Sequence, residues 1–157
     1  MEGRSTEAQR LAVDTRDAIV RLFSTLHEAA YAVTAGRVLN RVLGMKVVQL
    51  TVTGRNSGVP RRTMLTAPIV EDDRVVLVAS NGGDSRDPQW YRNLLVCPDV
   101  SVMWDGTVHS MRARVAAASE RPALWRRIRA ATPTYDFYQS RTTRQLPIVV
   151  LEPIDAS

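Results

Sequence analysis

The spacing of apolar residues changes at Gly44. Before it, apolar positions recur at steps of three and four, at Ile19, Leu22, Phe23, Leu26, Ala30 and Val33. That spacing gathers them on one side of a helix, which we expect to end at Gly36. A second, shorter helical stretch is predicted for residues 37–43. We therefore divide the chain into an N-terminal helical segment, residues 1–36, and a second part, residues 37–157.

Beyond Gly44 the apolar runs become short and rich in β-branched residues, which is typical of strands. The predicted strands are residues 47–53, 62–70, 74–80, 100–104, 107–116 and 146–153. The run 74–80 is almost wholly apolar, so we expect it to be buried on both faces. Asp105-Gly106 predicts a two-residue hairpin turn.

Two helices interrupt these strands. One is predicted for residues 88–95, where Pro88 opens the first turn. The other follows Ser119 and runs to about Ala131, before Pro133 breaks it. This order predicts an α+β, mainly β protein: a partly closed barrel of antiparallel strands with flanking helices. A doubly wound sheet would alternate strands and helices.

Composition narrows the function without naming it. The 157 residues fit one domain, and 45% of them are apolar. The net charge is +5, and Lys46 is the single lysine among 21 basic residues. Arginine suits bidentate contacts with phosphate or carboxylate, although a GC-rich genome explains the same bias equally well. The basic residues form no broad stripe with interleaved aromatics, so we expect no nucleic-acid partner.

Several other classes are excluded. Cys97 is the single cysteine and there are two histidines, so we expect neither a disulfide nor a metal site. No apolar stretch approaches the roughly 20 residues of a membrane span, and the start lacks a signal-peptide core. We expect a cytoplasmic protein, monomer or homodimer. The N-terminal helix either covers the barrel or makes a peripheral membrane contact.

The densest unusual chemistry lies in residues 53–62, between two predicted strands. Gly54 and Gly58 allow a tight turn and a close approach of the backbone to a ligand. Three arginines and two hydroxyls share the same ten residues. Guanidinium groups and turn N–H groups both donate to phosphate or carboxylate oxygens, so an anion site is predicted. The alternative is an ordinary hairpin with solvated arginines.

Three other segments complete a recognition site. The Asn81-Gly82-Gly83 segment suits backbone approach to a flat ring, Trp90 and Asn93 could stack on a cofactor and bond to it, and Tyr135 and Tyr138 could line an acceptor pocket. Each could instead be a turn, core packing or surface aromatics. The chain has no nucleophilic triad, dinucleotide fingerprint or Walker motif. A site that binds without its own nucleophile or metal suits a redox cofactor.

Four segments carry a family resemblance: residues 50–61, 78–83, 87–94 and 147–153. Together they resemble the deazaflavin-dependent nitroreductase family over about residues 37–153. The resemblance implies an FMN-binding-like split β-barrel and coenzyme F420 as cofactor, FMN being the less favoured ligand. It also implies hydride transfer from reduced F420 to a small-molecule acceptor such as a quinone, an activated alkene or a nitroaromatic.

The resemblance also assigns residues. The anionic tail of the cofactor would be held in the turn, by Gly54, Arg55, Asn56, Ser57, Gly58 and Arg61. The deazaflavin or its linker would be lined by Ala79, Ser80, Asn81, Trp90 and Asn93. The catalytic groups near the acceptor would be Tyr138, assisted by Tyr135 or Ser80, protonating or stabilising the developing oxyanion.

Three positions depart from the family pattern. Asn56 stands where a lysine is usual, which removes one charge from the tail site. Met64 replaces a common proline at a strand edge, and Thr132 replaces the first tyrosine of an aromatic segment. The last change predicts a wider or differently shaped acceptor pocket and speaks against nitroimidazole-type activation. The alternative function is a non-catalytic protein that binds flavin or deazaflavin.

Overall fold

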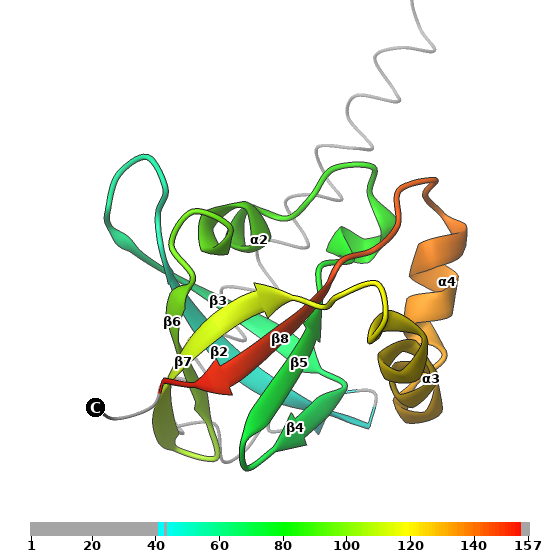
Figure 1. Cartoon of the computed structure of the whole chain (residues 1–157), viewed down its shortest axis with the longest axis horizontal. Helices are drawn as coiled ribbons and strands as arrows, with labels where there is room; N and C mark the ends of the chain where they lie inside the picture. Colours follow the sequence, from blue (N-terminus) through cyan, green and yellow to red (C-terminus); the bar gives the residue numbers. More distant parts are fainter. Residues whose placement is uncertain (1–40, 43, 155–157) are drawn as a thin grey trace, which may run out of the picture.

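The computed structural model describes residues 41–42 and 44–154, and its strands form one antiparallel sheet. The strands are β1 (Arg41–Val42), β2 (Met45–Thr53), β3 (Pro60–Ala67), β4 (Ile69–Glu71), β5 (Arg74–Val78), β6 (Asp99–Trp104), β7 (Thr107–Val115) and β8 (Ile148–Pro153). They run in the order β1-β2-β6-β7-β8-β5-β4, and β3 pairs with β2 on its other side. Because β3 also lies against β5, the sheet curves into a partly closed barrel (Figure 1).

Strands β5 and β8 form the wall between two hydrophobic cores. Val75 and Leu77 of β5 point into the barrel, whereas Val76 and Val78 point outward beneath the helices. Strand β8 alternates in the same way, with Val149 and Leu151 inside the barrel. Successive side chains of a strand point to opposite faces, so a wall between two cores must be apolar at every position. The buried run predicted at 74–80 is thereby confirmed over β5.

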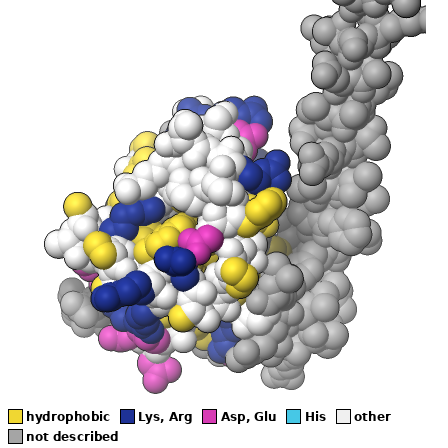
Figure 2. All heavy atoms as spheres, turned by 90° about the vertical axis from the view of Figure 1, so that its right-hand side faces the viewer, with side chains coloured by type: hydrophobic (Ala, Val, Ile, Leu, Met, Phe, Trp, Pro, Cys, Tyr) yellow, Lys and Arg dark blue, Asp and Glu magenta, His cyan; other side chains and the backbone are white. Residues whose placement is uncertain are grey.

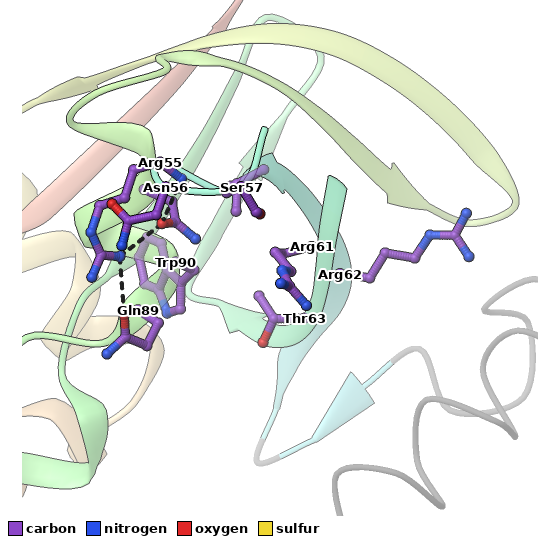
Figure 3. Close-up of a pocket in the computed structure, with 11 residues that line it drawn as sticks. Arg55, Asn56, Ser57, Arg61, Arg62, Thr63, Gln89 and Trp90 are labelled. Atoms are coloured by element: carbon purple, nitrogen blue, oxygen red, sulfur yellow. Dashed lines mark hydrogen bonds between the residues drawn. The ribbon is translucent and has the colours of Figure 1, made fainter. Parts of the chain in front are cut away.

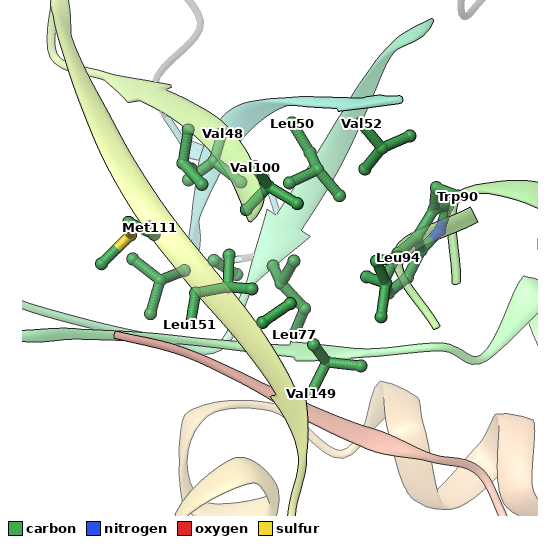
Figure 4. Packing of buried hydrophobic residues seen from close by; sticks show 14 of the residues in the cluster. Val48, Leu50, Val52, Leu77, Trp90, Leu94, Val100, Met111, Val149 and Leu151 are labelled. Atoms are coloured by element: carbon green, nitrogen blue, oxygen red, sulfur yellow. The ribbon is translucent and has the colours of Figure 1, made fainter. Parts of the chain in front are cut away.

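The inner core fills the barrel and is closed at one end by a short helix. Side chains of β2 and β8 meet Leu77 there, and Trp90 and Leu94 of α2 (Gln89–Leu94) lie at the end of this cluster (Figure 4). Helix α2 is six residues long. A helix this short is not stable alone, so its position depends on these two buried side chains.

The outer core lies under α3 (Arg121–Ala131) and α4 (Thr134–Ser140), which cover one side of the barrel (Figure 1). Helix α3 buries Leu124 and Ile128, while Arg126, Arg127 and Arg129 remain exposed. On this face basic and acidic side chains lie among one another (Figure 2). The basic run of α3 is therefore the solvated side of a packed helix.

Most predicted elements are confirmed to within a few residues, including the hairpin at Asp105-Gly106, where both residues have positive φ. Two predictions need correction, and one helix was missed. Residues 41–42 are a strand, not a helix, because they pair with Met45 and Lys46 across Gly44, whose φ is +78°. The strand predicted at 62–70 is two strands, β3 and β4, separated at Pro68. Helix α4 was not predicted.

The predicted N-terminal helix, residues 1–36, and its membrane contact lie outside the described residues. The division of the chain at residue 36 stays a prediction. Among the helices that the structure describes, none combines the length and apolar character that a membrane crossing requires.

Leu77→Ala should destabilise the barrel, because Leu77 is 1% exposed in the inner core. Truncating a buried leucine costs about 2–5 kcal/mol of unfolding free energy through lost burial and the cavity left behind. Chemical denaturation measures this cost. Val108→Ala, at a position 63% exposed, is the matched control and should change stability by less than about 0.5 kcal/mol.

Candidate functional site

The turn between β2 and β3 needs both of its glycines. The Gly54 N–H donates to the Val59 carbonyl at 2.9 Å, and the Gly58 N–H donates to the Gly54 carbonyl at 2.8 Å. Gly58 has a φ of +68°, which favours glycine, and a Cβ at Gly54 would lie 3.1 Å from the backbone oxygen of Val59 and 2.7 Å from Ser57 Oγ. The turn is therefore folded tightly on itself, with Ser57 above Gly54.

A cavity of about 540 Å³ opens beside this turn. It is lined by residues of the turn, of β2 and β3 and of α2: Val52, Gly54, Arg55, Asn56, Ser57, Arg61, Arg62, Thr63, Gln89, Trp90 and Asn93. Arg61 and Thr63 share one face of β3 and lie across the cavity from Trp90, whereas Arg62 extends away from them (Figure 3). The cavity thus has an aromatic wall and a basic wall.

Arg55 is fixed in this cavity by α2. Its Nη1 donates to Asn93 Oδ1 at 2.8 Å and to Gln89 Oε1 at 3.0 Å, and its backbone N–H donates to the same Asn93 oxygen at 3.2 Å (Figure 3). Asn93 is 7% exposed. Its side-chain oxygen is committed to Arg55, so Asn93 positions a cationic side chain of the cavity wall.

The charges in the cavity are not neutralised by the protein. Of the three arginines that line it, Arg55 and Arg61 remain beside the cavity while Arg62 directs its guanidinium away, and among the described residues no acidic one lines it. Several arginines elsewhere pair with carboxylates, as Arg112 does with Asp99 and Arg114 does with Glu120 and Glu152. Among the described residues no carboxylate lies within ion-pair distance of Arg55, Arg61 or Arg62. An anionic ligand would supply the missing negative charge.

The segment after β5 lies against α4, outside the lining of this cavity. Ala79 is fully buried, and Asn81 adopts a φ of +47° at the start of η1 (Asn81–Gly83). A Cβ at Gly83 would lie 2.7 Å from the carbonyl oxygen of Tyr138. Gly83 therefore permits close packing between this segment and α4, a different role from the approach to a flat ring expected from the sequence.

The structure does not bring the two predicted tyrosines to the arginine cavity. Tyr135 is 3% exposed, and its hydroxyl lies 3.2 Å from Thr66 Oγ1 and donates to the Thr66 carbonyl at 3.3 Å. Burial raises the pKa of this hydroxyl above its usual value. Tyr135 thus links α4 to β3 within the outer core. Tyr138 packs edge-on against it, with ring centroids 6.1 Å apart, and stays half-buried.

Thr132, the departure from the family's aromatic segment, is 4% exposed where α3 ends. Its hydroxyl donates to Thr134 Oγ1 at 2.9 Å and accepts from the Thr134 N–H at 3.3 Å. The side chain therefore joins α3 to α4.

Sequence reasoning missed three residues of this region. Thr63 could have been found from its alternation with Arg61 on β3, and Gln89 from its place one helical turn before Asn93. Arg144 gave no signal, because it is an isolated arginine whose bonds reach residues 79–87. Among the described residues no group of three His, Cys, Asp or Glu is placed to hold a metal ion.

Comparison with known proteins shows the family to which the chain belongs. A family model described as F420H(2)-dependent quinone reductase matches residues 23–153, and the chain belongs to this family. An F420H(2)-dependent quinone reductase of Mycobacterium tuberculosis (strain ATCC 25618 / H37Rv) is 38% identical over 134 residues, which are 80% of this chain and 87% of the relative.

Two solved structures are similar in fold and sequence. One, described as an F420-H2 dependent reductase (FDR-A), superposes with a TM-score of 0.62 at 36% identity and covers 68% of this chain and 93% of its own. The other, described as a domain-swapped dimer, gives a TM-score of 0.66 at 31% identity, over 82% of this chain and 96% of its own. The split β-barrel, the F420-dependent family and coenzyme F420 as cofactor are confirmed.

Asn93→Ala should cost about 1–3 kcal/mol of unfolding free energy, because the Arg55 N–H and guanidinium lose their shared acceptor. Asn56→Ala is the control: Asn56 lines the same cavity but is exposed, and its truncation should be nearly neutral. Urea denaturation of the two variants compares them. Equal stabilities would contradict the anchoring role.

Proposed function

We propose that this F420-dependent oxidoreductase reduces quinones, and that its arginine cavity binds the phosphate and acidic tail of the cofactor. The observation that carries the proposal is that Arg55 and Arg61 lie beside a glycine turn in a cavity that no described acidic residue lines. These groups fit the anionic end of coenzyme F420, since guanidinium and turn N–H groups donate to phosphate and carboxylate oxygens. The quinone is proposed from the name of the family and of its relatives.

The tail would meet a pre-arranged set of donors. Arg55 is already held in place by Gln89 and Asn93, so little side-chain entropy is lost when an anion binds to it. Arg61 faces the cavity from β3, and its side chain is free to follow the ligand. Asn56 contributes a neutral amide at a position where the family usually has a lysine, which weakens the field at that point of the tail.

The ring would be held by Trp90 and by the segment Ala79, Ser80 and Asn81. Trp90 is 8% exposed, belongs to the inner core and also forms part of the cavity wall, so it offers a rigid aromatic surface. The segment 79–81 and Trp90 are joined through the start of α2. The segment 79–81 and Trp90 are thus separated by only a few residues of the chain.

Reduced coenzyme F420, when bound, supplies a hydride. Conversion of a quinone to a hydroquinone takes up one hydride and one proton, or the hydride alone when the product leaves as its anion. Tyr138 is our candidate for the group that donates a proton or a hydrogen bond to the quinone oxygen. It is half-buried beside Gly83, whereas Tyr135 is bonded to Thr66 and supports the Tyr138 ring. Ser80 lies on the neighbouring segment and would assist it.

No observation favours the alternative of a non-catalytic flavin-binding protein. Of the two assemblies expected from the sequence, we propose the homodimer, supported by the similar structure described as a domain-swapped dimer.

Arg61→Ala should weaken F420 binding by about 1.5–3 kcal/mol, the cost of one hydrogen bond to a charged group. Fluorescence titration of the oxidised cofactor measures this. Arg126→Ala, which removes an exposed arginine on α3, should leave the dissociation constant unchanged. Wild-type affinity in Arg61→Ala would mean that the turn is a structural hairpin and that the cavity is not the tail site.

Tyr138→Phe should lower the turnover of a quinone such as menadione while leaving F420 affinity nearly unchanged, because it removes one hydroxyl and keeps the ring packed. Stopped-flow oxidation of the reduced cofactor and equilibrium titration separate the two effects. Tyr135→Phe is the control and should reduce stability by about 1 kcal/mol, with turnover close to wild type. Equal turnover in wild type and Tyr138→Phe would remove Tyr138 from the mechanism.

A further inference from the structure

Arg144 lies between α4 and β8 and makes several hydrogen bonds to residues 79–87, the segment that follows β5. Neither the fold nor the proposed function has so far given these bonds a role. Its Nε donates to the Asp84 carbonyl at 2.8 Å. Its Nη1 donates to the Ala79 carbonyl at 3.1 Å and to Asp87 Oδ1 at 3.0 Å. Its Nη2 donates to the carbonyls of Ala79 at 3.1 Å and Ser80 at 2.8 Å. One guanidinium thus collects acceptors from both ends of residues 79–87.

The backbone that carries this side chain is held by Gln139 of α4. The Arg144 carbonyl accepts from Gln139 Nε2 on α4 at 2.8 Å, and the Leu146 N–H donates to Gln139 Oε1 at 2.9 Å. The Arg144 side chain is 17% exposed, the least among the cations of the described ion pairs. Arg144 therefore transmits the position of the outer core to the segment 79–87.

We propose that Arg144 is a positioning residue for cofactor binding. It holds the carbonyls of Ala79 and Ser80, and through Asp87 it fixes the entry into α2, which bears Trp90 and Asn93. The inference rests on the proposed function, which gives the ring contacts to these same elements. A binding site held in its bound shape avoids the ordering cost on association.

The geometry requires an arginine. The acceptors are reached from Nε, Nη1 and Nη2, and only the guanidinium fork presents donors around its whole edge in this way. A lysine would keep the charge near Asp87 but lose the parallel bonds to the backbone carbonyls. Arg144→Lys therefore tests the fork separately from the charge.

The first measurement does not involve the cofactor. Within the segment the Gly83 N–H donates to the Ser80 carbonyl and the Asp84 N–H to the Asn81 carbonyl. Hydrogen exchange of residues 79–87 in the protein without ligand should be faster in Arg144→Lys than in wild type. Arg114→Lys is the matched control, since Arg114 also makes several bonds, to Glu120 and Glu152, but away from this segment.

The second measurement is F420 affinity, titrated well below the melting temperature. We expect Arg144→Lys to bind about tenfold more weakly and Arg114→Lys to bind as wild type does. Leu77→Ala, destabilised in the core but with the segment intact, should also keep wild-type affinity. This comparison separates positioning from a general loss of stability.

The outcomes are distinct. Wild-type exchange in residues 79–87 together with wild-type affinity in Arg144→Lys would overturn the proposal. So would an affinity loss in Arg144→Lys no greater than that in Leu77→Ala. If Arg144→Lys does not fold, Asp87→Asn, which keeps the acceptor and removes its charge, should show the same pattern to a smaller degree, and wild-type exchange and affinity there would likewise overturn it. A wild-type protein that does not bind F420 would refute the proposed function, while the exchange data would still report on Arg144.

Discussion

The two-residue period of β5 and β8 determines the rest of this structure. Because both strands separate two cores, every one of their central side chains is apolar, and neither strand can slip by one residue without exchanging its inner and outer sets. That constraint determines which side chains form the inner core on one face of these strands and which form the surface on which α3 and α4 pack on the other face. The cavity accordingly lies outside this wall, at the β2–β3 turn and helix α2.

The cavity arginine Arg55 is held by neutral partners, unlike many arginines elsewhere on the described surface. Outside the cavity, many of the described arginines are matched with carboxylates, as Arg127 and Arg74 are with Glu71, whose pKa they hold below its usual value. Such exposed pairs contribute little to stability, but they leave little net field around them. The cavity arginines are supported by amide oxygens instead, which orient Arg55 without neutralising it. The cavity therefore keeps positive charge that no described carboxylate neutralises.

The sequence predicted what short-range chemistry controls. The Asp105-Gly106 turn, the apolar run of β5 and the glycine-arginine turn are each encoded within a few residues, and each is found where it was expected. What it did not predict depends on distant partners. The two-residue strand β1 exists because β2 pairs with it, and its residues fit a helical pattern equally well. The bond of Tyr135 to Thr66 and the reach of Arg144 to Ala79 span more than 60 positions each, and no local pattern indicates them.

Helix α2 couples ligand binding to the stability of the barrel. The same six residues close the inner core through Trp90 and Leu94 and carry Gln89 and Asn93 to Arg55. If the cavity binds the cofactor as proposed, the ligand and the hydrophobic interior stabilise this helix jointly, so that each molecule of cofactor bound raises the free energy needed to open the barrel. Protein lacking its coenzyme would then be the form most readily degraded, and abundance in the cell would follow the supply of deazaflavin.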